Sequence, residues 1–210
     1  MDKTQAAIAV FDKNAQRYQE QFMDTGLYQD SFDLFCDHIK KSEATILDVA
    51  CGPGNITQYL LLKRPDWHIT GIDLAPNMLA LAGVNNPAAI FHLLDARAIR
   101  SLNRQWDGIM CGFCLPYLSR EEAVQFINDA ADTLYQHGVL YLSTMEDDYS
   151  RSGLQTSGSG EQLYMYYHEE GYLREALKQH NMNIIHTCRL CYPDKNGKEI
   201  TDRVIIAVKQ

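Results

Sequence analysis

The chain has no long hydrophobic run. Its uninterrupted apolar stretches, such as Tyr59 to Leu62, are only a few residues long, whereas a helix that spans a membrane needs about 20. Charged residues at positions 2–3 and 12–13 also interrupt the apolar segment that an amino-terminal secretory signal would require. These absences argue against a membrane-spanning helix and lead us to expect a cytoplasmic protein.

Basic residues are also scarce. The 210 residues include 19 Lys and Arg against 27 Asp and Glu, a net charge of −8, and no run of Lys or Arg occurs. Proteins that follow a phosphate backbone usually carry a basic patch, so the composition disfavours nucleic acid as a partner. The chain has no internal repeat, and its hydrophobic fraction of 46% is enough to bury the core of one globular domain.

Cysteine occurs at only six positions, four of which form two C-x-x-C pairs: Cys111 with Cys114, and Cys188 with Cys191. Two such pairs can form a zinc site. Here, however, both pairs fall in runs that we predict to be strands, where residues three apart point to opposite faces of the sheet. We therefore expect free thiols, with neither a metal site nor structural disulfides.

Apolar strands and amphipathic helices alternate along most of the chain. Two helices come first, with apolar stripes over residues 11–22 and 32–39. The strands that follow are predicted at 44–50, 68–73, 89–94, 106–112 and 139–144, and the helices between them at about 56–60, 76–82 and 123–134. Repeated strand–helix–strand units with apolar strands predict a doubly wound α/β fold, in which helices cover both faces of a mostly parallel sheet.

The carboxyl-terminal part breaks this alternation. Residues 146–162 are polar, and the Gly- and Ser-rich segment Ser152 to Gly160 is predicted to be a mobile loop. A helix over about 169–180 follows. An Asn-Gly dipeptide between the last two predicted strands indicates an antiparallel hairpin, formed by residues 183–192 and 201–209 with its turn at Asn196-Gly197.

The most informative segment is the glycine loop ILDVACGPGN, residues 46–55, which follows the first predicted strand of the sheet. In a doubly wound sheet, a loop at this position lets a ligand approach the backbone near a helix N-terminus. A dinucleotide fingerprint, G-x-G-x-x-G, anchored on Gly52 and Gly54 requires a third glycine where the chain has Thr57. A nicotinamide-dependent oxidoreductase is therefore kept only as an alternative.

The loop resembles the first motif of class I S-adenosylmethionine-dependent methyltransferases, which is an acid followed by G-x-G-x-G. Asp48, Gly52 and Gly54 match that motif, and Ala50 replaces its first glycine. The resemblance continues in residues 106–118, which are similar to the fourth-strand motif, and in the closing hairpin. It extends over nearly the whole chain from residue 11 onward and implies a seven-stranded, mostly parallel sheet.

The resemblance implies that S-adenosylmethionine is the cofactor. An ionised carboxylate is the natural acceptor for the two hydroxyl donors of a ribose, a role that the family gives to the acid at Asp73. The acid at Asp95 would lie near the adenine amino group. The implied cofactor-binding residues are Tyr18, Asp48, Ala50, Gly52, Asp73, Leu74, Met78, Asp95, Ala96 and Cys111. Core packing is the alternative role for Tyr18, Leu74 and Met78.

No motif identifies the methyl acceptor. Relatives that methylate amino groups of adenine or glutamine carry N-P-P-Y after the fourth strand, whereas this chain has the sequence CLPY at 114–117. The missing Asn argues against that branch. Small molecules, lipids and protein side chains stay open, and a small molecule is favoured because the chain has no large added domain. His168, as a general base, and Tyr117 are the only candidates for a catalytic residue.

We predict a single methyltransferase domain with four parts. Residues 1–42 form amino-terminal helices, 43–145 the cofactor-binding core, 146–167 a lid over the acceptor, and 168–210 a helix followed by the terminal hairpin. Closure of such a lid would exclude water from the transfer. The alternative to an enzyme is a non-catalytic protein that binds S-adenosylmethionine, and a homodimer is left open beside a monomer.

Overall fold

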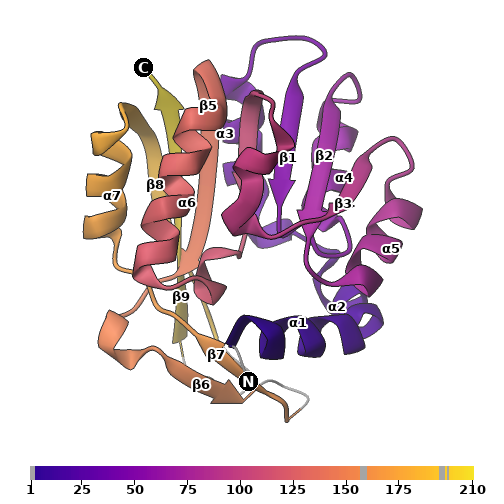
Figure 1. Ribbon diagram of the computed structural model, residues 1–210, viewed down its shortest axis with the longest axis vertical. Helices are drawn as coiled ribbons and strands as arrows, with labels where there is room; N and C mark the ends of the chain where they lie inside the picture. Colours follow the sequence, from indigo (N-terminus) through magenta and orange to yellow (C-terminus); the bar gives the residue numbers. More distant parts are fainter. Residues whose placement is uncertain (1–2, 157–159, 194–196, 198) are drawn as a thin grey trace.

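A seven-stranded sheet forms the centre of the molecule (Figure 1). The computed structural model describes residues 3–156, 160–193, 197 and 199–210. The strand order is β3-β2-β1-β4-β5-β9-β8. The strands are β1 (Thr45–Val49), β2 (His68–Asp73), β3 (Ile90–Leu93), β4 (Trp106–Cys111), β5 (Leu134–Met145), β8 (Met182–Pro193) and β9 (Glu199–Lys209).

Six strands of the sheet run in one direction, and β9 runs in the opposite direction. β1 pairs in parallel with β2 and β4, and β3 and β5 extend the parallel part on either side. β9 then pairs antiparallel with both β5 and β8. The predicted fold class, including the carboxyl-terminal hairpin, is therefore confirmed. Asn196 of the predicted turn lies outside the described residues.

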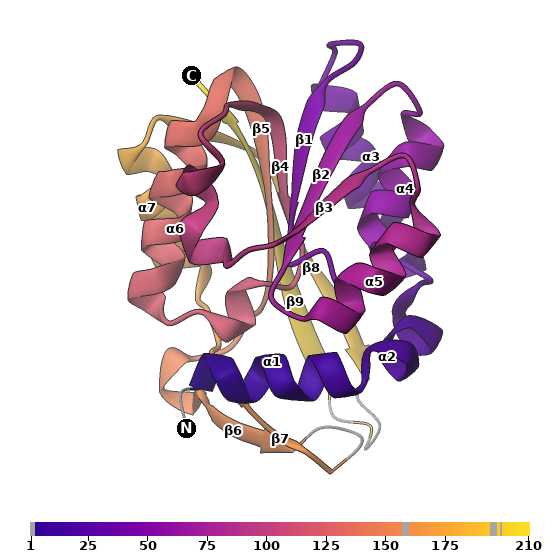
Figure 2. The same ribbon diagram turned by 45° about the vertical axis from the view of Figure 1, so that its right-hand side comes forward.

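Helices cover both faces of the sheet (Figure 2). One side carries α3 (Gln29–His38), α4 (Asn55–Lys63) and α5 (Pro76–Asn85), and the other carries α6 (Arg120–Thr133), α7 (Glu170–Gln179) and the 3-10 helix η2 (Ala96–Leu102). Phe32, Phe35 and Leu60 are buried on the first side, and Phe126 and Leu173 on the second. Two continuous apolar layers thus fix the sheet and, with it, the edge where its parallel strands end.

Helix α6 begins three residues before the predicted apolar stripe. Ser119 accepts a hydrogen bond from the backbone N–H of Glu122, and the Glu122 carboxylate accepts one from the backbone N–H of Ser119. This reciprocal capping satisfies backbone donors that the first turn of a helix leaves unpaired. The polar first turn therefore belongs to the helix, although it contributes nothing to the apolar stripe.

The amino-terminal helical region consists of two helices, α1 (Lys3–Lys13) and α2 (Ala15–Phe22), rather than the single stripe expected over residues 11–22. The break falls at Asn14, whose side-chain amide donates to the Val10 carbonyl and to Glu161. Such side-chain bonds compete with regular helix geometry. Both helices lie across the end of the sheet to which the parallel strands point (Figures 1 and 2).

The segment after β5 is structured, which corrects the predicted mobile loop. A short 3-10 helix, η4 (Tyr149–Arg151), leads into a two-stranded sheet formed by β6 (Gly153–Thr156) and β7 (Gln162–Met165). Positions 157–159 of the Gly/Ser-rich segment lie outside the described residues. The hairpin lies against α1, where Lys13 forms an ion pair with Glu161 and the ammonium of Lys3 lies 3.5 Å from the centre of the Tyr164 ring.

Among the described residues, no helix combines the length and the apolar character that crossing a membrane requires.

Candidate functional site

A cavity opens at the carboxyl ends of β1, β2, β3 and β4, beneath α1. It contains about 890 Å³ of empty space, a volume that includes open solvent. In doubly wound sheets this edge is where ligands bind. The lining residues are Thr4, Ala7, Ile8, Phe11, Tyr18, Ala50, Gly52, Asp73, Leu74, Ala75, Met78, Leu94, Asp95, Ala96, Arg97, Gly112, Phe113, Cys114, Tyr117 and Leu118.

The glycine loop forms one wall of this cavity. Ala50, Gly52 and Gly54 have φ values of 54°, 54° and 79°, in the left-handed region that favours glycine. At Gly54 a side chain is also excluded by contact, because an added Cβ would lie 2.3 Å from the Nδ2 atom of Asn86. Ala50 adopts the same backbone conformation with a methyl group, so the small residue in place of the motif's first glycine preserves the shape of the loop.

Asp73 ties the second strand to this loop. One carboxylate oxygen accepts the backbone N–H of Gly52 at 2.9 Å, and the other accepts the N–H of Ala75 at 2.8 Å. Burial raises the pKa of the Asp73 carboxyl, against the lowering effect of these backbone bonds. Each carboxylate oxygen has two lone pairs. Asp73 can therefore accept a further hydrogen bond from a ligand in the cavity without giving up its place in the loop.

Asp95 is held at the far end of the cavity by an arginine. It caps η2 through the backbone N–H of Arg97, and the Arg97 guanidinium lies 2.6 Å from Asp95 and 2.7 Å from Glu122. Although burial acts to raise it, the hydrogen bonds from Arg97 hold the pKa of Asp95 below its usual value. Arg97 lines the cavity but was absent from the sequence prediction, because no motif marks the residue two positions after the acid.

Aromatic side chains close the cavity from the amino-terminal side. The Phe11 ring meets the rings of Tyr18 and Tyr117 edge-on, at centroid distances of 5.9 and 5.1 Å. Burial raises the pKa of Tyr18 to about 12, so its hydroxyl stays neutral. The sequence indicates Phe11 only as part of a helical stripe and does not mark Ala7 and Ile8 as lining residues, because an apolar stripe does not distinguish a core from a cavity wall.

Eight of the ten predicted cofactor-binding residues line the cavity, together with Tyr117, and Asp48 and Cys111 do not. Asp48 is buried in β1, where one carboxylate oxygen accepts the Thr57 hydroxyl at 2.6 Å. Its other oxygen, Oδ1, has no hydrogen-bond partner among the described residues. Burial raises the pKa of the Asp48 carboxyl to about 7. Neither side chain is therefore part of the cavity lining.

His168 lies outside the cavity, and both of its ring nitrogens have partners. One ring nitrogen, Nε2, lies 2.8 Å from the Leu115 carbonyl, and the other, Nδ1, contacts the Tyr172 hydroxyl. Because a carbonyl only accepts, Nε2 carries the proton and Nδ1 accepts from the tyrosine. Burial lowers the pKa of His168 to about 4. The structure therefore gives His168 the role of a neutral link between α7 and the 3-10 helix η3 (Leu115–Tyr117).

The two C-x-x-C pairs differ in structure. Cys188 and Cys191 lie on β8 as expected, but Cys114 lies beyond the end of β4. Phe113, with φ 64°, turns the chain there, and the two thiols of Cys111 and Cys114 come within hydrogen-bonding reach of each other. All six cysteines are free, and no cluster of three or more His, Cys, Asp or Glu with metal-binding geometry occurs within the described part of the chain.

The purified protein is expected to hold no stoichiometric zinc, because the two cysteine pairs lie on different elements and no third ligand joins either pair in the described residues. Elemental analysis after dialysis should give well under about 0.1 zinc per chain, and thiol titration in denaturant should count six free cysteines. A zinc content near one per chain would contradict this expectation.

A family described as "Methyltransferase domain" matches residues 46–138, which run from the glycine loop to the start of β5. This part of the chain is thus similar to a methyltransferase domain. The matched range contains the glycine loop and the acids Asp48, Asp73 and Asp95.

Curated methyltransferases with similar sequences match only part of the chain. It is 32% identical over 142 residues to the malonyl-[acyl-carrier protein] O-methyltransferase of Acetivibrio thermocellus, a match that covers 64% of this chain and 47% of that protein. A shorter match, 38% identical over 56 residues, is to the trans-aconitate 2-methyltransferase of Methylobacterium nodulans and covers 27% of this chain and 22% of that protein. The chain thus spans about half or less of the length of these relatives.

Solved methyltransferase structures share the whole fold. Magnesium protoporphyrin IX methyltransferase from Synechocystis PCC 6803, with bound S-adenosylmethionine, covers 100% of this chain and 98% of its own, with a TM-score of 0.76 and 16% identity. The 1,6-didemethyltoxoflavin-N1-methyltransferase of Burkholderia thailandensis covers 98% and 88%, with a TM-score of 0.72 and 18% identity. At these identities the likeness establishes the fold.

Proposed function

We propose that this methyltransferase binds S-adenosylmethionine in the cavity beneath α1 and transfers its methyl group to a small-molecule acceptor. The observation that carries the proposal is Asp73, a carboxylate that lines the cavity and anchors Gly52 of the glycine loop. A ribose diol needs such a bidentate acceptor. The class I methyltransferases that the chain resembles use this cofactor.

The residues around the cavity fit the parts of the cofactor. Asp73 would hold the ribose, Leu74 and Met78 would flank the adenine, and Asp95 with Ala96 would lie near its amino group. The methionine end would meet Ala50, Gly52 and Tyr18. The unpartnered Asp48 oxygen fits a donor in this region, such as an ammonium or a water molecule that it holds, because a buried carboxylate oxygen without a partner is costly.

Methyl transfer from S-adenosylmethionine requires little from the protein beyond alignment of the two reactants. Bound S-adenosylmethionine supplies a sulfonium methyl group whose leaving group is already a neutral thioether. Orientation of two reactants alone can recover about 7–11 kcal/mol of a barrier. The described lining residues include no histidine. We therefore propose that the aromatic and aliphatic walls act by positioning the acceptor and excluding water, with Tyr117 as the nearest candidate for a direct contact.

Methyl transfer can be tested with labelled cofactor. The protein should transfer label from S-adenosylmethionine to a component of a small-metabolite mixture, and an Asp73→Ala variant should transfer far less. Binding of S-adenosylhomocysteine without transfer to any component would support the alternative of a non-catalytic binding protein. Binding of a nicotinamide cofactor instead would support the oxidoreductase alternative.

The segment 146–167 is proposed to act as a lid over the acceptor. In the structure α1 lies directly over the cavity, and the β6–β7 hairpin packs on α1 through Lys13–Glu161 and Lys3–Tyr164. Hydrogen exchange should show partial protection of residues 146–167 with S-adenosylhomocysteine and fuller protection when a confirmed acceptor is added. Equal protection with and without the acceptor would contradict a lid role.

The remaining assignments are proposals of the same kind. A cytoplasmic location is supported by six free cysteines, since disulfides are rare in reducing compartments. A homodimer is supported by the edge strand β3, where Ile90 and Leu93 are each 61% exposed. The net charge of −8 argues against a nucleic acid substrate.

A further inference from the structure

A second polar cluster lies outside the cavity wall, built from three distant parts of the chain. The hydroxyl of Tyr28, in the 3-10 helix η1 (Gly26–Tyr28), donates to Oδ2 of Asp202 on β9 at 2.5 Å. The hydroxyl of Tyr192, on β8, donates to the same oxygen at 3.1 Å. Asp202 is 0% exposed, and its other oxygen, Oδ1, has no hydrogen-bond partner among the described residues.

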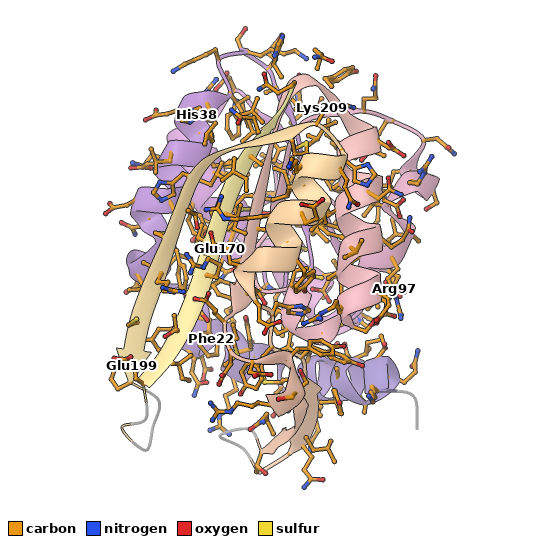
Figure 3. All side chains as sticks on the ribbon, turned by 90° about the vertical axis from the view of Figure 1, so that its left-hand side faces the viewer. Phe22, His38, Arg97, Glu170, Glu199 and Lys209 are labelled. Carbon is orange, nitrogen blue, oxygen red and sulfur yellow. The ribbon has the colours of Figure 1, made fainter. Side chains whose placement is uncertain are left out.

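This cluster lies at the edge of the sheet where the cavity opens. Asp202 pairs with Met145, the last residue of β5, so it lies level with the carboxyl ends of the parallel strands. Figure 3 shows β9 starting, at Glu199, toward the same end of the molecule as Phe22 of α2, and finishing at Lys209 toward the opposite end. The ring of Phe113, which lines the cavity, meets the Tyr28 ring edge-on at 4.8 Å.

No cation neutralises Asp202 within the described residues. It forms no ion pair there, and the guanidinium of its neighbour Arg203 is held by Glu146 and Glu170, each at 2.9 Å. A buried carboxylate is normally paired, because burial without compensation is costly. Burial raises the pKa of Asp202, although the Tyr28 and Tyr192 hydroxyls act to lower it. The hydroxyls of Tyr28 and Tyr192 satisfy one carboxylate oxygen of Asp202, Oδ2, and the other oxygen, Oδ1, is left for a ligand.

We propose that Tyr28, Tyr192 and Asp202 form the acceptor subsite of this methyltransferase and bind a protonated amino group of the acceptor. An ammonium supplies both the charge and the hydrogen-bond donors that Oδ1 lacks. The aromatic rings of Tyr28, Tyr192 and Phe113 suit such a group, since ammonium ions are attracted to ring faces. The two tyrosine rings are half-buried, so rotation of one side chain gives the amine access.

The subsite selects acceptors by charge. A carboxylate at this position would meet the buried Asp202 carboxyl and be excluded, whereas an amine is retained beside Phe113 and the cavity. The amino group is an anchor, and the methylated atom is a different group of the same acceptor that reaches the cavity. This inference rests on the proposed function, so its test separates the amine subsite from cofactor binding.

The test uses three probes with the same ring: benzylamine, benzyl alcohol and benzoate. Each is titrated into wild-type protein saturated with S-adenosylhomocysteine, and again into protein without it, with the tyrosine ring resonances observed by NMR. Benzylamine should bind at least about tenfold more tightly than the other two and shift the Tyr28 and Tyr192 resonances. In an Asp202→Asn variant its affinity should fall at least about tenfold, while the affinity for S-adenosylhomocysteine stays unchanged.

An Asp132→Asn variant is the matched control, since it removes one carboxylate from a side chain on α6 that is 49% exposed and paired with Arg100. It should bind benzylamine as the wild type does. Equal amine affinity in Asp202→Asn, or benzoate binding as well as benzylamine, would overturn the subsite. If Asp202→Asn does not fold, the three probes on wild-type protein decide alone. Failure of S-adenosylhomocysteine to bind would instead count against the proposed function.

Discussion

Replacement of Asp73 by alanine is expected to lower the affinity for S-adenosylhomocysteine by about 30- to 1,000-fold. The change removes two charge-assisted acceptors from the proposed ribose site, worth roughly 2–4 kcal/mol together. It also frees the backbone N–H groups of Gly52 and Ala75, which the carboxylate holds at 2.9 and 2.8 Å. Calorimetric titration of the folded variant measures the loss directly.

Two further variants sharpen this prediction. Asp73→Asn keeps an oxygen for one backbone N–H but loses the charge, so its affinity should fall between those of the wild type and Asp73→Ala. Asp132→Ala, on the half-exposed surface of α6, should bind as the wild type does. An unchanged affinity in folded Asp73→Ala would remove Asp73 from the cofactor site.

Asp48 is expected to make the stability of the fold depend on pH. Burial raises the pKa of this carboxyl from its usual 3.8 to about 7. At pH values between about 4 and 7, the Asp48 carboxyl is ionised in the unfolded chain and protonated in the folded protein. The stabilising contribution of the protonated group is therefore complete below about pH 4. It is lost as the pH rises through about 7, at roughly 1.4 kcal/mol per pH unit.

An Asp48→Asn variant removes this titration while keeping an oxygen for the Thr57 hydroxyl. Relative to the wild type, the variant should therefore gain on the order of 2–4 kcal/mol in unfolding free energy between pH 4 and pH 8. Denaturant unfolding of both proteins across this range measures the difference, and Asp132→Asn controls for the loss of one carboxylate. A wild-type-to-variant difference that does not change with pH would show that Asp48 ionises normally in the folded protein.

The sheet could be predicted from sequence because most of its strands are apolar and are separated by clear turn signals. β2 was predicted with its observed bounds, His68–Asp73. The β6–β7 hairpin could not be predicted in the same way, because each of its strands has only four residues and its partner is α1 rather than the main sheet. The division of the first helix at Asn14 also depends on a distant residue, Glu161.

Some residues of the site could likewise be predicted from the sequence, and others could not. Asp73 and Asp95 were predictable because each ends a strand at a fixed place in a motif, and both line the cavity. His168 looked available in the sequence, yet the carbonyl of Leu115 and the hydroxyl of Tyr172 occupy its ring. The cluster at Asp202 had no sequence signal at all, since 174 residues separate Tyr28 from Asp202.

Titration calorimetry of the wild-type protein with S-adenosylhomocysteine and with NAD most directly tests the proposal that the cavity is a methyl-donor site. The predicted result is saturable binding of S-adenosylhomocysteine at about one molecule per chain, displaced by S-adenosylmethionine, with no heat of binding from NAD. Binding of NAD in place of S-adenosylhomocysteine, or no binding of S-adenosylhomocysteine by folded protein, would contradict it.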